Sequence, residues 1–246
     1  SAGGLFPNML KRAGVDHLII DGRASAPVRI LVTEGGVQIL DAEEELFESV
    51  GGRKTVRRAS AITDFLSQKY PGSSTVCLGP AGWSQAAFAC LTGDYHRNFG
   101  RGGAGAVFGS KNLVAVTASG RAPVAYADAA EFQKLSRELD ARIKSHVNDP
   151  SRTVSFRPAA GTTWWLDRAF NGKYLGKSGG YLPWRNFDEG YFDPRAYAGV
   201  STAAFLEISG KHAVCSRCRH IMCTRSAKVE GKPYAAAGVR PEFETI

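Results

Sequence analysis

Three cysteines near the end of the chain have the spacing of metal ligands. They occur as C-x2-C-x4-C at Cys215, Cys218 and Cys223, within the segment CSRCRHIMC. Thiolates this close in sequence can bind an iron–sulfur cluster or a zinc ion. An iron–sulfur cluster needs a fourth cysteine, whereas zinc could use His212 or His220 from the flanks. The spacing favours a metal site but leaves iron–sulfur, zinc and no metal at all open.

The stretch HRNFGRGGAGAVFGSKN, residues 96–112, is rich in glycine and in basic side chains. Gly100, Gly102 and Gly105 form the pattern G-x-G-x-x-G, which binds dinucleotides when a buried strand precedes it and a helix begins at its third glycine. The polar, turn-like residues 91–99 and the glycine at position 109 argue against both elements. We therefore expect no dinucleotide site here.

The same stretch still has the chemistry of an anion site. Closely spaced glycines let consecutive backbone N–H groups approach a phosphate, and Arg97, Arg101 and Lys111 can supply positive charge. The spacing from Gly105 to Lys111 does not fit the Walker motif. A glycine-rich turn with solvated arginines is the alternative interpretation.

The composition is that of a globular domain. The 246 residues are 43% hydrophobic and 22% charged, and no apolar run approaches the roughly 20 residues that a membrane span requires. The N-terminal segment SAGGLF also lacks the pattern of a signal peptide, so we expect a cytoplasmic protein. The net charge of +8 is scattered, and its densest patch, residues 52–58, is interpreted as the solvated start of a helix, not as a nucleic-acid site.

Hydrophobic periodicity predicts strands in the first half of the chain. Three short strands are expected within residues 17–40, with a hairpin turn at Gly35-Gly36, and a helix is expected over 54–69. Further strands are expected at the remaining apolar runs, which are 74–79, 86–93, 113–120 and 122–128. The other two cysteines, Cys77 and Cys90, lie in two of these runs and are interpreted as core thiols.

The second half has a helical pattern. Asp128 and Glu131 form a capping box, and apolar residues at helical spacing follow as far as Val147. Shorter helices are expected at 161–170 and 194–208. We therefore predict an α+β protein with a β-rich domain over residues 1–127 and a mostly helical domain over 128–246.

Several segments together resemble one family, the tungsten- or molybdenum-pterin aldehyde:ferredoxin oxidoreductases. They follow the family's order and cover nearly the whole chain; the matching segments are SAGGLF at 1–6, LKRAGVDHLIIDGRASAPV at 10–28, GPAGWSQAAFACL at 79–91, HRNFGRGGAGAVFGSKNLVAV at 96–116, LPWRNFDEGYF at 182–192, the cysteine cluster, and RPEFETI at 240–246. The matches at the glycine-rich stretch and at the C-terminal end are the most specific.

The resemblance implies what the glycine-rich stretch binds. In this family the corresponding loop holds the phosphates of a bis-pterin cofactor of tungsten or molybdenum, next to a magnesium ion that bridges the two pterins. The matching positions are Arg97, Asn98, Gly100 and Arg101. The first residues of the chain resemble a second phosphate contact; they are Ser1, Ala2 and Gly3. The implied β-rich domain is thus a partial pterin-binding domain.

The resemblance also assigns roles at the other end of the chain. Cys215, Cys218 and Cys223 resemble three of the four ligands of a 4Fe-4S cluster that passes electrons to ferredoxin or to an iron–sulfur subunit. Glu244 matches a carboxylate beside the metal, where it could carry a proton during aldehyde oxidation. The family's usual cysteine spacing is C-x2-C-x3-C, so Met222 stands where the third ligand is expected, and Cys223 requires a local bulge.

The implied function is part of an enzyme that oxidises a small aldehyde to a carboxylic acid. Pieces of the family pattern are absent at both ends, so we expect a fragment or a subunit that needs a second chain or a missing C-terminal portion. A non-catalytic metal-binding or assembly module is the first alternative. The second is the active-site subunit of a family member with another substrate, such as an aromatic-ring reductase.

Overall fold

The computed structural model describes residues 3–148, 160–170, 188, 193–216, 218, 223–231 and 235–239. The chain divides into two compact units, residues 1–126 and 127–246, which are described separately. Both strands and helices are present in each, which confirms the predicted α+β class. None of the helices in these ranges has the length and apolar character that crossing a membrane would demand.

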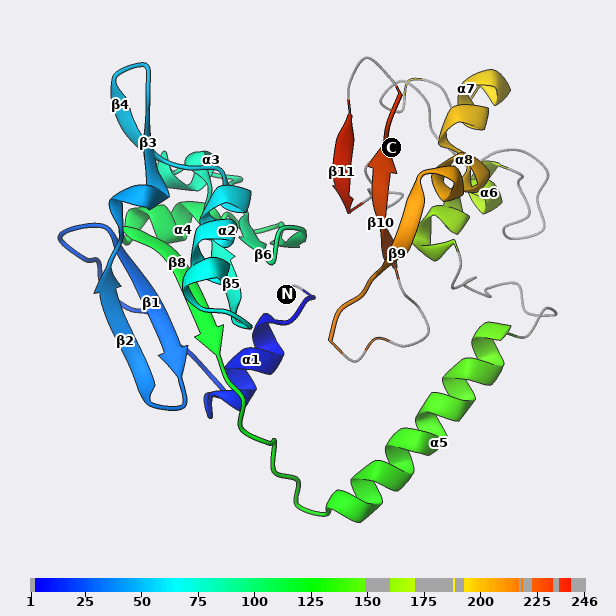
Figure 1. Cartoon of the computed structure of the whole chain (residues 1–246), viewed down its shortest axis with the longest axis horizontal. Helices are drawn as coiled ribbons and strands as arrows, with labels where there is room; N and C mark the ends of the chain where they lie inside the picture. The colour runs from blue at the N-terminus through cyan, green and yellow to red at the C-terminus, as the bar shows by residue number, and fades with distance from the viewer. Residues whose placement is uncertain are drawn as a thin grey trace. The chain divides into compact units, whose positions relative to one another are not determined.

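The first unit is built on a six-stranded mixed sheet (Figure 1). The central strand β8 is buried at six of its seven residues, as expected for a strand covered on both faces. It pairs in parallel with β1 and antiparallel with β5. The strand order is β2 (Gly36–Asp41), β1 (Val28–Thr33), β8 (Leu113–Ser119), β5 (Ser74–Cys77), β6 (Leu91–Gly93) and β7 (Arg97–Phe99).

Two hairpins extend the first unit. The hairpin predicted at Gly35-Gly36 is confirmed, with its turn one residue earlier at Glu34-Gly35, because Thr33 pairs with Gly36 where β1 turns into β2. A second hairpin joins β3 (Phe47–Val50) to β4 (Arg53–Val56) through Gly51-Gly52, whose positive φ angles of 59° and 76° fit a tight two-residue turn. The helix predicted over residues 54–69 is therefore wrong at its start. The two glycines let the strands pair, and helix α2 begins only at Ala59.

Helices pack against the sheet of the first unit through two apolar clusters. Helix α2 (Ala59–Lys69) buries Ile62 and Leu66 against the sheet, and the η1 turn (Glu44–Leu46) adds the buried Leu46. Helix α1 (Phe6–Arg12) packs on a second cluster that includes residues of β1 and β8. Two short helices, α3 (Pro80–Trp83) and α4 (Ala104–Ser110), pack against each other, and α4 also contacts β8 while α3 contacts β4.

Three predicted strand segments differ from the structure. Residues 17–20, 86–90 and 122–128 form no strand. Strand β6 takes up only the end of the predicted run 86–93, whereas β5 and β8 form inside their predicted runs. Residues 86–90 follow helix α3, where Ala86 N donates to the Ala81 carbonyl and Ala89 N to the Ala86 carbonyl. These turn hydrogen bonds replace a strand ladder over that run.

In the second unit, the predicted long helix is α5 (Ala129–Asn148), and Asp128 Oδ1 accepts from Glu131 N at 2.9 Å, as the capping box predicts. The 161–170 segment forms η2 (Gly161–Thr163) and α6 (Trp164–Phe170). The 194–208 segment is two helices, α7 (Pro194–Val200) and α8 (Thr202–Glu207), because Ser201 is extended and caps α8 through Ala204 N.

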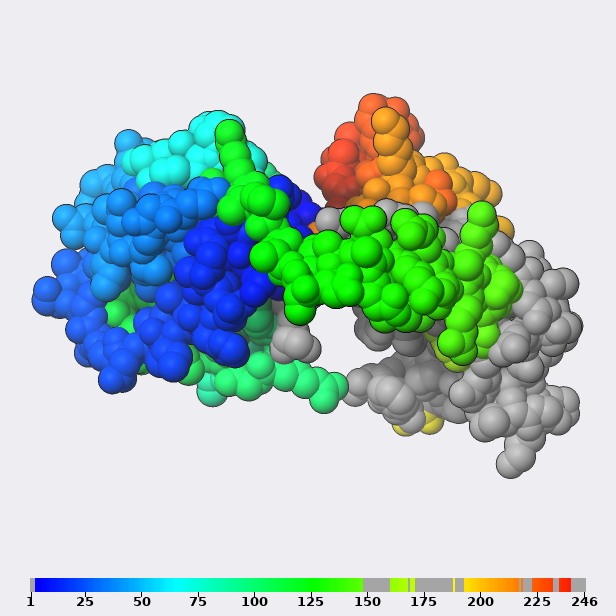
Figure 2. All heavy atoms as spheres, turned by 90° about the horizontal axis from the view of Figure 1, so that it is seen from below, coloured from blue at the N-terminus to red at the C-terminus, as the bar shows by residue number. Residues whose placement is uncertain are grey.

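A three-stranded antiparallel sheet completes the second unit. Its order is β11 (Ala236–Val239), β10 (Thr224–Val229) and β9 (Ser209–Ala213). The sequence analysis did not predict this sheet. Helix α5 lies at the surface of the space-filling view (Figure 2), with Leu135 and Leu139 of its apolar face more than half exposed.

Candidate functional site

A strand, a loop and a helix carry the glycine-rich stretch. Strand β7 ends at Phe99 and helix α4 begins at Ala104, so residues 100–103 form the loop between them. The expectation that no strand precedes this loop and that no helix follows it is wrong. Gly109 lies inside α4 because the position has no room for a side chain: a Cβ atom there would stand 2.0 Å from the Gly82 carbonyl oxygen. Strand β7 is nevertheless a three-residue antiparallel edge strand, which is not the element that precedes a dinucleotide loop.

The glycines of this stretch are of two kinds. At Gly103 and Gly105 a Cβ atom would come within 2.4 Å of the carbonyl oxygens of Ala87 and Cys90, so these glycines allow close packing. At Gly100 and Gly102 a Cβ would meet nothing within 4 Å. Gly102 and Gly103 also have consecutive positive φ angles of 86° and 66°. Successive glycines in this conformation can aim backbone N–H groups at an anion.

The predicted basic residues lie at different places around this loop. Arg101 is exposed within it, and Arg97 is half-buried in β7, paired with Gly93. Lys111 lies at the other end of α4, where its Nζ donates to the Gly22 carbonyl at 3.0 Å. Seven helical residues separate it from the loop, about 10 Å of helix. The suggestion that Lys111 supplies charge to the same anion is therefore not supported, because this side chain fixes the segment before β1.

The start of the chain lies beside Arg97. Gly4 has a φ of 99°, and a Cβ there would stand 3.0 Å from Arg97 Cγ. Leu5 N donates to Asp94 Oδ2 at 3.3 Å, which joins the same segment to the turn before β7. The structure thus brings Gly4 to Arg97, although the two residues are more than 90 positions apart in sequence. Ser1 and Ala2, which the resemblance also implicates, lie outside the described residues.

His96 is a polar residue at this place that is not among the candidate site residues of the sequence. Its Nδ1 atom is buried and has no hydrogen-bond partner among the described residues. Burial and the neighbouring Arg97 lower the pKa of its imidazole, against a smaller raising effect of Asp94. The ring is therefore predominantly neutral near pH 7. Its position immediately before Arg97 is the one signal in the sequence that could have identified it.

The three clustered cysteines lie in the connection between β9 and β10. Cys218 N donates to the Cys215 carbonyl at 3.1 Å, so these two residues share a turn, and Cys223 directly precedes β10. The Cys223 carbonyl accepts from Thr162 N at 3.0 Å, which ties it to η2. All three thiols are partly exposed and form no disulfide. In the described ranges no three cysteine, histidine or acidic side chains are gathered as a metal-binding group.

The other candidate ligands are placed as follows. His212 lies in β9 opposite Arg225, with its Nε2 atom 3.3 Å from Arg225 Nη1. Cys77 is buried in the first unit, and burial raises the pKa of its thiol to about 12, as expected for an inert core cysteine. His220, Met222 and the predicted catalytic Glu244 lie outside the described residues.

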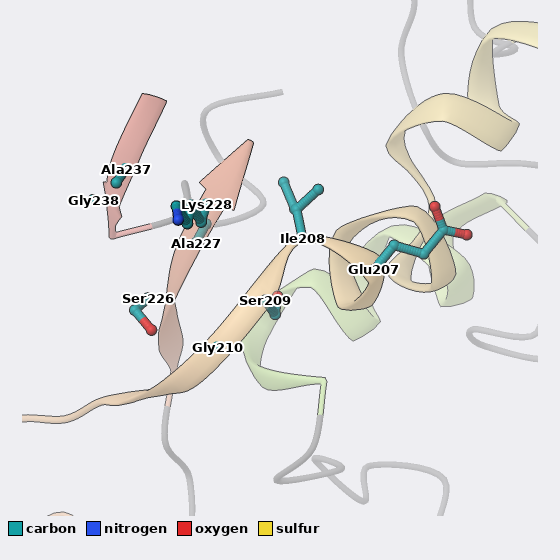
Figure 3. Close-up of a pocket in the computed structure, with 9 residues that line it drawn as sticks. All are labelled: Glu207, Ile208, Ser209, Gly210, Ser226, Ala227, Lys228, Ala237 and Gly238. Atoms are coloured by element: carbon teal, nitrogen blue, oxygen red, sulfur yellow. The ribbon is translucent and has the colours of Figure 1, made fainter. Parts of the chain in front are cut away.

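A shallow hollow of about 430 Å³ lies on the sheet of the second unit (Figure 3). Its lining residues come from α8, β9, β10 and β11, and the adjoining Ile208. Of the predicted site residues that the structure describes, none lines it. It is therefore not the candidate site.

Comparison with known proteins connects these features. Residues 1–120 match the family model described as aldehyde ferredoxin oxidoreductase, N-terminal domain. Proteins named tungsten-containing aldehyde ferredoxin oxidoreductase from Pyrococcus furiosus and Thermococcus kodakarensis are each 31% identical to this chain over its whole length. The chain spans only 37% of the length of each of these relatives.

Two further similarities involve proteins with other names. An aliphatic sulfonate oxidoreductase, WOR-like subunit, from Pyrococcus furiosus is 33% identical over 47% of this chain and 19% of its own length. The active site complex BamBC of benzoyl coenzyme A reductase, solved in complex with 1,5-dienoyl-CoA, has a TM-score of 0.74. That match covers the whole of this chain and 36% of the solved chain at 20% identity, so it shows a shared fold.

Proposed function

Because the chain belongs to the aldehyde ferredoxin oxidoreductase family, we propose that it is part of a pterin-metal enzyme that oxidises aldehydes to carboxylic acids. The reaction converts an aldehyde and water into a carboxylic acid, two protons and two electrons. The relatives named for this activity are almost three times as long. The working enzyme therefore includes a further portion, either on a longer form of this chain or on a second chain. Residues 1–127 are the partial pterin-binding domain, and residues 128–246 begin the helical domain.

The geometry of the glycine loop supports phosphate binding. Gly100 and Gly102 face open space, Gly102 and Gly103 are consecutive left-handed residues, and the exposed Arg101 adds charge. Together with Arg97, these residues fit the phosphate end of a bis-pterin cofactor. This arrangement is the single observation that carries the proposal.

When bound, a tungsten- or molybdenum-pterin would supply two-electron oxidation chemistry, and a 4Fe-4S cluster would supply one-electron transfer to ferredoxin. In our proposal the loop and Arg97 hold the phosphates. The Asn98 carbonyl would help to hold a magnesium ion, and Ser1, Ala2 and Gly3 at the start of the chain would supply the second phosphate contact. The protein's share is orientation and electrostatics.

For the cluster, the proposal assigns Cys215, Cys218 and Cys223 as three ligands. Support comes from the shared turn of Cys215 and Cys218 and from the anchoring of Cys223 at the other end of the same connection. The described residues do not gather these thiols into a ligand set, so no electron-transfer step is derived from their positions. The fourth ligand belongs to the missing portion.

Metal content tests the proposal directly. The chain is expressed with its neighbouring reading frames, purified without oxygen, and analysed for tungsten, molybdenum, iron and zinc. Iron together with tungsten or molybdenum is expected. Arg101→Ala should lower the content of tungsten or molybdenum and of pterin, whereas Arg53→Ala, an exposed arginine in the β3–β4 hairpin, should not. Zinc alone would contradict the proposal and favour the non-catalytic metal-binding or assembly module.

Glu244 is proposed as the proton carrier. Glu244→Gln should lower aldehyde-dependent dye reduction by about 100-fold or more while tungsten and pterin content is kept, because general acid–base groups contribute about that much. Glu242→Gln is the matched control two residues away. Equal activity of the two variants would remove Glu244 from the mechanism.

A second candidate is the active-site subunit of a family member with another substrate. The shared fold with a benzoyl coenzyme A reductase complex and the similarity to an aliphatic sulfonate oxidoreductase subunit favour it. Turnover of an aromatic acyl-CoA or of a sulfonate by the metal-loaded preparation, without turnover of aldehydes, would select it.

A further inference from the structure

The carboxylate of Asp94 joins three separate segments of the first unit. Its Oδ2 atom accepts from Ser74 Oγ at 2.6 Å and from Leu5 N at 3.3 Å. Its Oδ1 atom accepts from Thr75 N at 3.2 Å. One side chain therefore connects the start of the chain, the first residues of β5 and the turn between β6 and β7.

The backbone at Asp94 is held in an uncommon conformation. Asp94 and Tyr95 have φ angles of 44° and 72°, in the left-handed region that non-glycine residues rarely adopt. Asp94 N donates to the Thr75 carbonyl at 3.1 Å, and His96 N donates to the Asp94 carbonyl at 3.0 Å. Both the backbone and the side chain thus fix this turn, and the turn fixes the position of Arg97 in β7.

The segment that Asp94 ties down lies directly on Arg97. Any side chain at Gly4 would place its Cβ 3.0 Å from Arg97 Cγ and 3.5 Å from Asp94 Oδ2. Glycine at position 4, with its positive φ, is what allows the chain to pass this closely. The hydrogen bond from Leu5 N to Asp94 therefore sets where Gly4 lies relative to Arg97.

We infer that Asp94 is a positioning residue that holds Gly4 and Leu5 against Arg97, so that two segments distant in sequence form one phosphate-binding surface. This inference rests on the proposed function. Asp94 acts through its neighbours: its carboxylate is engaged by neutral donors of the protein, two backbone N–H groups and one hydroxyl.

The test compares Asp94→Asn with Asp64→Asn in the full chain. Asp64 is the matched control because it accepts from the Tyr95 hydroxyl at 2.8 Å and so contacts the same turn without touching the start of the chain. Asparagine keeps the shape of aspartate but offers one acceptor oxygen instead of two. Ser74→Ala is a second variant, which removes one bond to the carboxylate and leaves its charge.

Two quantities are measured on folded protein. In the metal-free chain, the exchange rate of the Leu5 amide, followed by NMR, should rise about tenfold in Asp94→Asn, since a bond to a charged acceptor is lost. In protein expressed with its missing portion, tungsten or molybdenum and pterin per folded chain should fall several-fold. Asp64→Asn should change neither quantity. Ser74→Ala should give effects between those of wild type and Asp94→Asn, with a smaller rise in Leu5 exchange and a smaller fall in cofactor content.

The outcomes distinguish failure of the positioning role of Asp94 from failure of the proposed function. Unchanged Leu5 exchange in Asp94→Asn, or faster exchange with wild-type cofactor content, would overturn the positioning role while leaving the proposed function intact. Absence of pterin and of both metals from the wild-type protein would overturn the proposed function, and this inference with it. Parallel changes in exchange and in cofactor content are the result that supports the inference.

Discussion

At the scale of single residues, the first unit contains a largely buried ion pair between Arg29 and Glu43. Arg29 is almost fully buried in β1, and its guanidinium donates two-pronged to Glu43, which also accepts from Lys69 at 2.7 Å. Partial burial raises the pKa of the Glu43 carboxyl, but the hydrogen bonds from Arg29 and Lys69 outweigh it and lower the pKa to about 2. Removing one partner would leave a buried charge without compensation.

Stability should therefore depend on Glu43 at acid pH. The folded-state pKa lies below the ordinary value of 4.5, so the stabilisation is fully present above pH 4.5 and is lost as the pH falls towards 2. On the order of 2 to 3 kcal/mol is expected to disappear over that window. Urea unfolding from pH 7 to pH 2.5 measures it. Glu43→Gln should flatten this part of the pH profile, whereas the exposed Glu44→Gln should follow the wild type, and parallel profiles for all three proteins would contradict the expectation.

At the scale of elements, the glycine-rich stretch combines packing and ligand binding. Gly105 lets α4 lie directly on the Ala89–Cys90 backbone, and its N–H donates to the Ala89 carbonyl at 2.9 Å. Gly100, on the other side of the loop, has open space around it. The same residue type thus has two physical roles five positions apart.

Alanine substitution should separate these roles. Gly105→Ala forces a methyl group to within 2.4 Å of a carbonyl oxygen, so the free energy of unfolding should fall by about 1 to 3 kcal/mol. Gly100→Ala should change it by less than about 0.5 kcal/mol, as at an open surface position, and should instead lower pterin content. Denaturant unfolding and pterin analysis measure the two effects. Equal destabilisation by both substitutions would show that the loop has only a packing role.

At the scale of the whole molecule, the segment that leaves the first unit is clamped to it. Glu34, in the β1–β2 turn, accepts from Arg121 N at 2.5 Å and Ala122 N at 3.1 Å, and Arg12 donates to the carbonyls of the same two residues. At Gly120 a Cβ would stand 2.2 Å from Ala13 N. The hydrogen bonds from Arg121 and Ala122 lower the pKa of Glu34, with Arg121 the larger contributor.

Proteolysis should detect this clamp. Trypsin should cut slowly after Arg121 in the native chain, because a protease acts on the opened segment. Glu34→Ala should speed this cut at least about threefold, in proportion to the more frequent opening. Glu48→Ala, an exposed glutamate in β3, is the control. Mass spectrometry of timed digests measures the rates, and equal rates in both variants would mean that Glu34 does not hold the segment.

The sequence by itself determined the features that arise from local pattern. The buried apolar run 113–120 predicted β8, the Asp128–Glu131 box predicted the start of α5, and strand patterns followed by helical patterns predicted the α+β class. It failed where a pair of glycines redirected the chain, as at Gly51-Gly52, and where turn hydrogen bonds replaced a strand, as at residues 86–90. Local propensity cannot report contacts that depend on distant partners.

Only the tertiary structure decided which of the candidate residues share a surface. The spacing of Arg97, Arg101 and Lys111 offered three cations for one anion, but α4 carries Lys111 away to Gly22. Conversely, nothing local relates Leu5 to Asp94, and the fold joins them across 89 residues of sequence. Residue types and their order define which chemistry is possible, whereas long-range packing and hydrogen bonds fix which groups meet.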